Sequence, residues 1–177
     1  MNKSKLTKIV IGLCLLLIVG SFLFMFGGNI GNGSGIKTVT NGDMTMPEAN
    51  AITDEIKKNT IVEQDFVYSP DTISEVAIVF TRKYYLEGVR VTIQLLDGNN
   101  VLASHTQNVA GIDDQHRTYL TPDKKITGVS GKTLTLKIYS EDKADTGLAI
   151  MMQENKKLSF KFGNKEIQGT LCFSVSE

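Results

Sequence analysis

The residues best suited to recognition chemistry form one short run, in which two tyrosines lie beside charged side chains. Tyr84 and Tyr85 follow Arg82 and Lys83 and precede Glu87. Such a run offers aromatic rings for stacking next to groups that donate and accept hydrogen bonds. The structural alternative is that one tyrosine covers the end of a core and the charges are merely solvated. The candidate ligand-binding residues are Arg82, Tyr84, Tyr85 and Tyr119, and Tyr68 and Tyr139 are further aromatic residues that could join them.

The other reactive residue types do not form a catalytic pattern. The two histidines, His105 and His116, are the side chains that could act as bases near neutral pH. His116 follows Asp113 and Asp114, but three ligands within four residues lack the spacing of a structural zinc site, and calcium does not favour imidazole. A solvated acidic loop is the better interpretation. Cys172 has no adjacent motif that would activate its thiol. We expect no enzyme, no metal and no cofactor, with a hydrolase as the weakest alternative.

An apolar run near the N-terminus predicts where these residues are located. Ile9 to Phe26 is a stretch of eighteen residues without a charge, and Lys3, Lys5 and Lys8 precede it. As a helix it would span roughly 27 Å, close to the hydrocarbon core of a bilayer. Lysines on its N-terminal side alone favour a cytoplasmic N-terminus. We therefore predict a cytoplasmic segment over 1–8, a transmembrane helix over 9–26 and an extracytoplasmic remainder.

Two other interpretations of the apolar run compete with a retained anchor. In the first, a peptidase cleaves a secretory signal near Val19-Gly20-Ser21, and the rest is secreted. The apolar residues that continue to Phe26 argue against this cleavage. In the second, Cys14 carries the lipid of a lipoprotein. Leu13 before it is too large for the pattern of such signals, so we treat Cys14 as an apolar residue of the helix.

Beyond the apolar run, the composition predicts a tether and one domain. Residues 27–42 hold glycines among small polar residues, which favours a flexible linker. Residues 43–177 are enough for a single core. Sixteen basic residues remain against nineteen acidic ones once the three N-terminal lysines are set aside, so no basic face suggests a nucleic acid partner. Cys172 is the one cysteine of this domain, which excludes an internal disulfide.

A period of two dominates the domain and predicts half-buried strands. In Gly88–Leu95, apolar residues alternate with Arg90, Thr92 and Gln94, and in Lys132–Tyr139 they alternate with polar residues in the same way. The other predicted strands are 61–68, 75–81, 101–107, 117–120, 148–152, and the alternating segments around 158–162 and 171–175. About nine strands without long crossovers predict a mainly β fold, namely a two-sheet sandwich or jelly roll.

Turn and helix signals complete the prediction. Asp97-Gly98-Asn99-Asn100 and Gly163-Asn164 are typical of hairpin turns, because these residues tolerate positive φ. Helical character is expected only in Met46–Lys58, where Ile52 and Ile56 are four residues apart, and it should not exceed one or two turns.

Three segments of this pattern resemble a known class of module. They are the strand opening Glu63-Gln64-x-Phe66, the alternating strand that ends at Asp97-Gly98, and Gly131-Lys132 leading into Leu134-x-Leu136-x-Ile138. Over roughly 60–152 the chain is similar to extracytoplasmic jelly-roll modules of bacterial membrane proteins, in the layout of galactose-binding-like and carbohydrate-binding modules. The resemblance implies a non-catalytic binding or accessory module and assigns no ligand residue. The chain departs from sugar-binding platforms in having no tryptophan.

Two functions therefore compete. The first is a membrane-anchored extracytoplasmic module that binds an envelope glycan or protein, for which an exposed aromatic patch would be expected. The second is a structural or assembly subunit that packs on another envelope protein through a large apolar patch.

Overall fold

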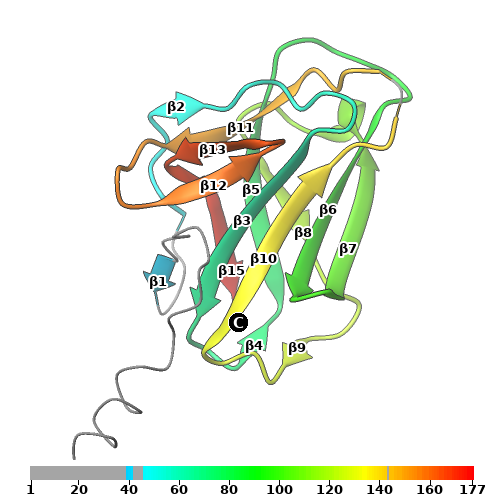
Figure 1. Ribbon diagram of the computed structural model, residues 1–177. Coiled ribbons are helices and arrows are strands. Elements are labelled where there is room, and N and C mark those ends of the chain that lie inside the picture. The colour runs from blue at the N-terminus through cyan, green and yellow to red at the C-terminus, as the bar shows by residue number, and fades with distance from the viewer. Residues whose placement is uncertain (1–38, 42–45, 143) are drawn as a thin grey trace, which may run out of the picture. The chain divides into compact units, whose positions relative to one another are not determined.

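The computed structural model describes residues 39–41, 46–142 and 144–177. They form fifteen strands and one 3₁₀ helix, η1 (Val109–Gly111) (Figure 1). The mainly β fold is thereby confirmed. The predicted transmembrane segment 9–26 and most of the predicted linker 27–42 lie outside these residues. Within the described part of the chain, no helix has the length and apolar character needed to cross a bilayer.

The strands form two large sheets and one small ribbon. The first sheet has the order β13 (Lys165–Gln168), β12 (Ser159–Phe162), β3 (Ile61–Tyr68), β10 (Lys132–Tyr139), β6 (Arg90–Asp97), β7 (Asn100–Asn108), and β1 (Val39–Asn41) runs parallel to β3. The second contains β14 (Thr170–Leu171), β11 (Leu148–Gln153), β5 (Glu75–Arg82) and β15 (Phe173–Ser176), with β2 (Ala51–Ile52) beside β11 and β8 (Arg117–Leu120) beside β5. The ribbon pairs β4 (Thr72–Ile73) with β9 (Ile126–Thr127).

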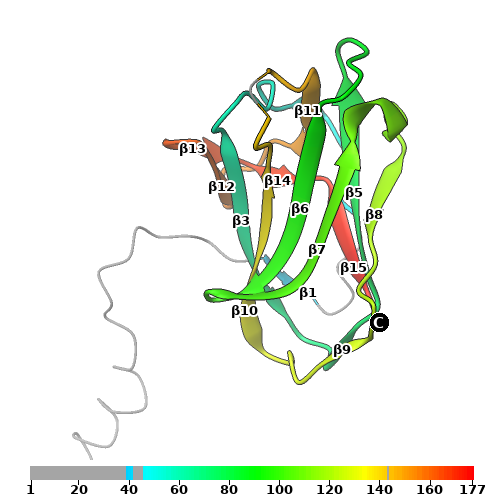
Figure 2. The same ribbon diagram turned by 90° about the vertical axis from the view of Figure 1, so that its right-hand side faces the viewer.

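The two large sheets face each other, and a sandwich fits this arrangement. Figure 2 shows β3, β6 and β7 on one side and β5, β8 and β15 on the other. The alternation of buried residues explains the layering, because every second side chain of β3 and β10 points into the shared core. The rings of Phe66 on β3 and Phe173 on β15 meet across it, with centroids 5.2 Å apart.

One polar side chain also bridges the sheets inside this core. Gln64 on β3 is 1% exposed. Its amide donates to the Thr170 hydroxyl at 2.7 Å and accepts from the Leu171 backbone N–H at 2.7 Å. Because both bonds reach β14 of the second sheet, Gln64 fixes the position of one sheet on the other.

The nine predicted strands are confirmed. They correspond to β3, β5, β6, β7, β8, β10, β11, β12 and the pair β14–β15, which is interrupted at Cys172. Both predicted hairpin turns are also present, with φ of 58° at Gly98 and 58° at Gly163. The strands that the sequence pattern did not reveal are short: β1, β2, β4, β9 and β13.

The helical character expected in Met46–Lys58 is wrong. This segment runs as an irregular edge strand along β11: the N–H groups of Asn50, Thr53 and Ile56 donate to carbonyls of Met152, Ile150 and Leu148. Three residues on this edge match two on β11, so the extra residues bulge outward. Ile52 is 51% exposed and Ile56 is fully buried, so the two isoleucines do not share a face.

Candidate ligand-binding groove

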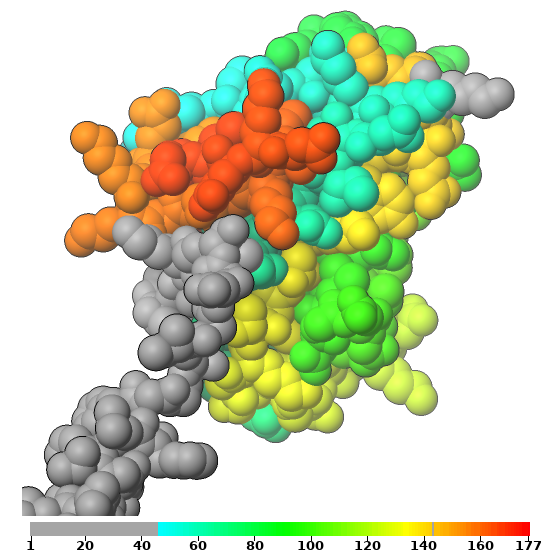
Figure 3. Space-filling model, viewed as in Figure 1, coloured from blue at the N-terminus to red at the C-terminus, as the bar shows by residue number. Residues whose placement is uncertain are grey.

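The outer face of the first sheet carries ordered rows of polar side chains. The strand register aligns Ile61, Tyr139, Thr92 and Thr106 in one row across β3, β10, β6 and β7. Directly paired residues point to the same side of a sheet, and the neighbours of Tyr139 and Thr92 in sequence, namely Ile138, Val91 and Ile93, are buried in the core. In Figure 3 the hairpin β12–β13, then β3 and β10, then β6 and β7 follow one another across this face.

A groove of about 270 Å³ lies at one end of these rows. It is formed where β6 begins, β10 ends and β7 closes the edge of the sheet. The described residues that line it are Arg90, Thr92, Ser104, Thr106, Tyr139, Glu141 and Asp142. All of them have polar groups, so the groove can form hydrogen bonds along its whole length.

Hydroxyl groups form the floor of the groove. The Thr92 and Thr106 hydroxyl oxygens lie 2.8 Å apart and share one hydrogen bond. The Gln94 amide donates to the Ser104 hydroxyl at 3.3 Å in the next row. A hydroxyl offers one donor and two lone pairs. After these internal bonds, the pair of threonines still has one donor and several lone pairs for a ligand.

An ion pair forms one wall. The Arg90 guanidinium lies 3.2 Å from Asp142 Oδ1, and the Arg90 backbone N–H donates to Asp142 Oδ2. That backbone hydrogen bond, with the side-chain bond as the second cause, holds the pKa of Asp142 below its ordinary value of 3.8. Asp142 thus joins the loop after β10 to the first residue of β6 and neutralises Arg90.

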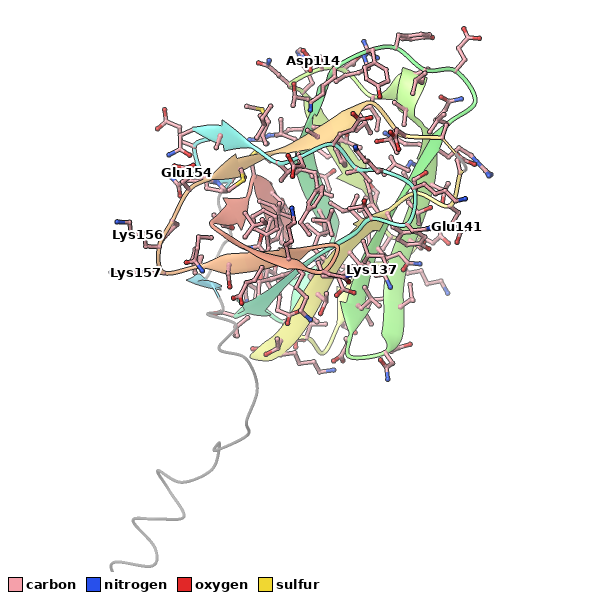
Figure 4. All side chains as sticks on the ribbon, turned by 45° about the horizontal axis from the view of Figure 1, so that its top comes forward. Asp114, Lys137, Glu141, Glu154, Lys156 and Lys157 are labelled. Atoms are coloured by element: carbon pink, nitrogen blue, oxygen red, sulfur yellow. The ribbon has the colours of Figure 1, made fainter. Side chains whose placement is uncertain are left out.

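An aromatic ring and a second carboxylate complete the lining. Tyr139 is half-buried between Ile61 and Thr92, and the Lys137 ammonium lies 5.6 Å from its ring centroid. Glu141 is exposed at the rim. Figure 4 shows Glu141 beside β6 and β7, whereas Lys156 and Lys157 project from the far side of the domain. The groove therefore combines one aromatic ring with hydroxyls and carboxylates.

Three of the four predicted ligand-binding residues lie together, but outside the groove. Arg82 ends β5, and Tyr84 and Tyr85 follow in the loop that crosses to β6. The Arg82 guanidinium donates to the Ile112 carbonyl at 3.0 Å and lies 5.4 Å from the centroid of the Tyr85 ring. Tyr85 is 59% exposed. The arrangement gives an exposed aromatic surface at one end of the sandwich.

Tyr84 is held by its hydroxyl group. It donates to Glu55 Oε1 at 2.5 Å, and this hydrogen bond is the main reason that the pKa of Tyr84 rises from 10.0 to about 12. The same carboxylate oxygen accepts from the Gly147 backbone N–H at 2.9 Å. Gly147 has a φ of 70°, and a Cβ there would come within 3.0 Å of the Tyr84 ring. Tyr84 therefore closes the end of the sandwich.

The remaining predicted tyrosines are elsewhere. Tyr119 is 46% exposed on β8 and pairs with Ala77, five residues before Arg82 on β5. At about 3.3 Å per residue, that places the Tyr119 backbone roughly 17 Å away from Arg82 along the strand. Tyr68 is fully buried and donates to the Thr72 carbonyl at 3.0 Å. The structure thus does not bring Tyr119 or Tyr68 to the loop of Tyr84 and Tyr85.

Six of the seven lining residues were not proposed from the sequence as ligand-binding, and Tyr139 was considered only as an addition. A signal existed, because alternation placed Arg90 and Thr92 on one outer face and Tyr139 on another. Only the register of β10 beside β6 shows that these faces are the same one.

The acidic loop before β8 has a structural role. Asp114 Oδ1 accepts from the Arg82 backbone N–H at 2.7 Å and from the Thr81 hydroxyl at 3.0 Å. These hydrogen bonds, the backbone one first, lower the pKa of Asp114. Among the described residues, no three histidine, cysteine or acidic side chains are grouped as a metal site would require.

Comparison with protein-family models and with curated protein sequences finds no match.

Proposed function

We propose that this protein is a non-catalytic module that binds an uncharged glycan through the groove on its first sheet. The observation that carries this proposal is the composition of the groove: hydroxyls on its floor and the half-buried ring of Tyr139 in one row. Sugars present hydroxyls to polar groups and C–H faces to aromatic rings, so they match both features.

The charges of the groove favour an uncharged ligand. Among the described lining residues Arg90 is the one cation, and its charge is offset by Asp142. Glu141 adds an exposed carboxylate at the rim. An acidic sugar would meet this carboxylate, and like charges repel. The Lys137 ammonium, 5.6 Å from the Tyr139 ring centroid, is itself 3.9 Å from Glu63 Oε1.

The strand order supports a jelly-roll assignment for the module. The first sheet contains β13, β12, β3, β10, β6 and β7 with β1 beside β3, and the second contains β14, β11, β5 and β15 with β2 and β8 alongside. Two mainly antiparallel sheets built from segments that alternate between them are typical of jelly rolls, which include lectin domains. The apolar run 9–26 would hold the module at the outer surface of the membrane as a single-pass anchor.

The test is glycan binding by the full chain in lipid nanodiscs, first on an array of neutral oligosaccharides and then by calorimetry. Thr92→Val with Thr106→Val removes both floor hydroxyls at nearly constant shape. Since each hydrogen bond contributes about 0.5–1.5 kcal/mol, we expect affinity to fall by roughly tenfold or more. The matched control is Thr72→Val with Thr127→Val. These two threonines are paired with each other on β4 and β9, outside the groove. Failure of every array glycan to bind, or equal affinity of the two double variants, would reject the proposal.

The exposed loop of Tyr85 favours a second candidate, in which the module packs on an envelope protein. Tyrosine and arginine are enriched among the residues that dominate protein interfaces, and Tyr85 lies against Arg82. Under this alternative, Tyr85→Ala reduces crosslinking to a membrane partner, whereas the variant with Thr92→Val and Thr106→Val crosslinks normally. The two candidates therefore predict opposite sensitivities for the same two variants.

A further inference from the structure

The outer edge of β7 is long and open. β7 is the last strand of the first sheet and has nine residues. Val109 N–H donates to the Val89 carbonyl at 2.8 Å, and the antiparallel ladder alternates from that pair. The backbone N–H and C=O groups of Ser104, Thr106 and Asn108 therefore point away from β6. They form no backbone hydrogen bond to another described residue.

The other edge strands of the two large sheets are shorter than β7. β13 has four residues and carries Lys165 and Glu166, β8 has four and begins with Arg117, and β15 has only four. The edge beside β11 is interrupted by its outward bulges. Short, charged or bulged edges prevent strands of other chains from adding to a sheet.

β7 lacks these protections over most of its length. Between Asn100 and Asn108 there is no charged aspartate, glutamate, lysine or arginine side chain. The register shift between Leu95 and Leu96 places one bulge at Leu102, near the beginning of the strand. The six residues from Ala103 to Asn108 remain regular, so this half of the edge is available to an added strand.

We propose that β7 pairs with β7 of a second copy of this chain, antiparallel and about a two-fold axis at Thr106. In this register Ser104 faces Asn108 of the other copy and Thr106 faces itself. All these residues direct their free backbone groups outward, so each pair can exchange two hydrogen bonds. The segment has no aspartate, glutamate, lysine or arginine, and His105 faces Gln107 of the other copy, so self-pairing brings no like charges together. Its hydroxyls can hydrogen-bond across the axis. A two-fold contact uses the same edge on both copies.

The pairing would also join the two grooves, because Ser104 and Thr106 belong to both the edge and the groove lining. A two-fold axis perpendicular to the sheet keeps both outer faces on the same side. One extended ligand could then contact both grooves, which raises apparent affinity through effective concentration. This consequence rests on the proposed glycan function, but the pairing itself does not.

Disulfide trapping of the full chain in liposomes tests the pairing without any glycan. In the proposed register Thr106→Cys faces its own copy at a Cα separation of about 5.5 Å, which a disulfide can span. We expect a covalent dimer under mild oxidation. The matched control is Thr127→Cys, an exposed threonine on β9, and the unsubstituted chain accounts for Cys14 and Cys172. A Thr106→Cys chain that folds by circular dichroism and crosslinks no more than Thr127→Cys would overturn the proposal.

Two further variants separate specific pairing from random collision. The proposed register places His105 opposite Gln107 of the other copy, so H105K/Q107K and H105E/Q107E should each abolish the Thr106→Cys dimer by like-charge repulsion. An equal mixture of the two should restore it. Should Thr106→Cys fail to fold, a mixture of Ser104→Cys and Asn108→Cys chains replaces it, because these residues face each other. Absence of mixed dimers from folded chains would likewise reject the pairing.

Discussion

At the scale of single residues, Glu55 organises the end of the sandwich where the exposed tyrosines lie. One of its carboxylate oxygens accepts from both the Tyr84 hydroxyl and the Gly147 N–H. The edge segment, the loop after β5 and the loop before β11 are thereby tied at one atom. A charge-assisted bond of this kind is stronger than a neutral one. The loop of Tyr84 is therefore built on a defined support.

This support should be visible in the alkaline titration of the protein. The Glu55 hydrogen bond raises the pKa of Tyr84 to about 12, above its ordinary value of 10.0. The stability that this bond provides is present below pH 10 and is lost as the pH rises through about 12. We expect Glu55→Gln to lower the pKa of Tyr84 toward its ordinary value. Tyrosinate absorbance, with Tyr84→Phe subtracted to isolate this residue, measures the change. An unchanged pKa in Glu55→Gln would contradict the assigned cause.

The buried hydrogen bonds of Gln64 should contribute measurably to the stability of the fold. Gln64→Leu leaves the buried Leu171 N–H and the Thr170 hydroxyl without their present partner. We expect a loss of about 2–3 kcal/mol in the free energy of unfolding. Gln94→Leu is the control, because its amide bonds only the exposed Ser104 hydroxyl and should cost about 0.5 kcal/mol or less. Thermal melts of both variants measure this difference in stability. Equal stability of the two variants would contradict the role of Gln64 in holding the sheets together.

At the scale of elements, strands with a recognisable apolar pattern could be predicted, and five short strands could not. β6 and β10 direct apolar residues into the core and mostly polar residues to the outer face, which produces the period of two. β4 and β9 have two residues each, too few to show a period. The helix prediction for Met46–Lys58 failed because the four-residue spacing of Ile52 and Ile56 also fits a helix. In the structure, bulges beside β11 leave Ile52 exposed and Ile56 buried.

The loop after β10 is the element that shapes the groove, and its attachment should be sensitive to acid. Because Arg90 holds the pKa of Asp142 below 3.8, the unfolded state takes up this proton first. The stabilisation is present above about pH 4 and is lost as the pH falls through the lowered pKa. We expect Asp142→Asn to have a lower melting temperature than the unsubstituted chain at pH 7. At pH 3 this difference in melting temperature should be smaller. A constant difference at both pH values would show that Asp142 ionisation is not involved.

At the scale of the whole molecule, the location of the groove depends on contacts between distant segments. Arg90, Thr106 and Asp142 come from three parts of the chain that only sheet pairing and loop closure bring together. Local alternation indicates which side chains point outward, but not which strands are neighbours. The cluster of Arg82 and Tyr85 could be predicted because its members are adjacent in sequence. The groove could not, because no short-range pattern encodes its register.

Cys172 offers a measure of how far the two sheets unfold as one unit. Its side chain is 2% exposed, and burial raises the pKa of its thiol to about 11, so the folded state protects it from thiol reagents. In a Cys14→Ala chain we expect labelling of Cys172 only through global opening, with a rate that follows the free energy of unfolding. Gln64→Leu should then accelerate labelling by roughly 30- to 150-fold, the equivalent of its loss of about 2–3 kcal/mol, while Gln94→Leu should leave the rate nearly unchanged. Labelling that ignores both denaturant and Gln64→Leu would instead show that β14 and β15 open locally, without separation of the sheets.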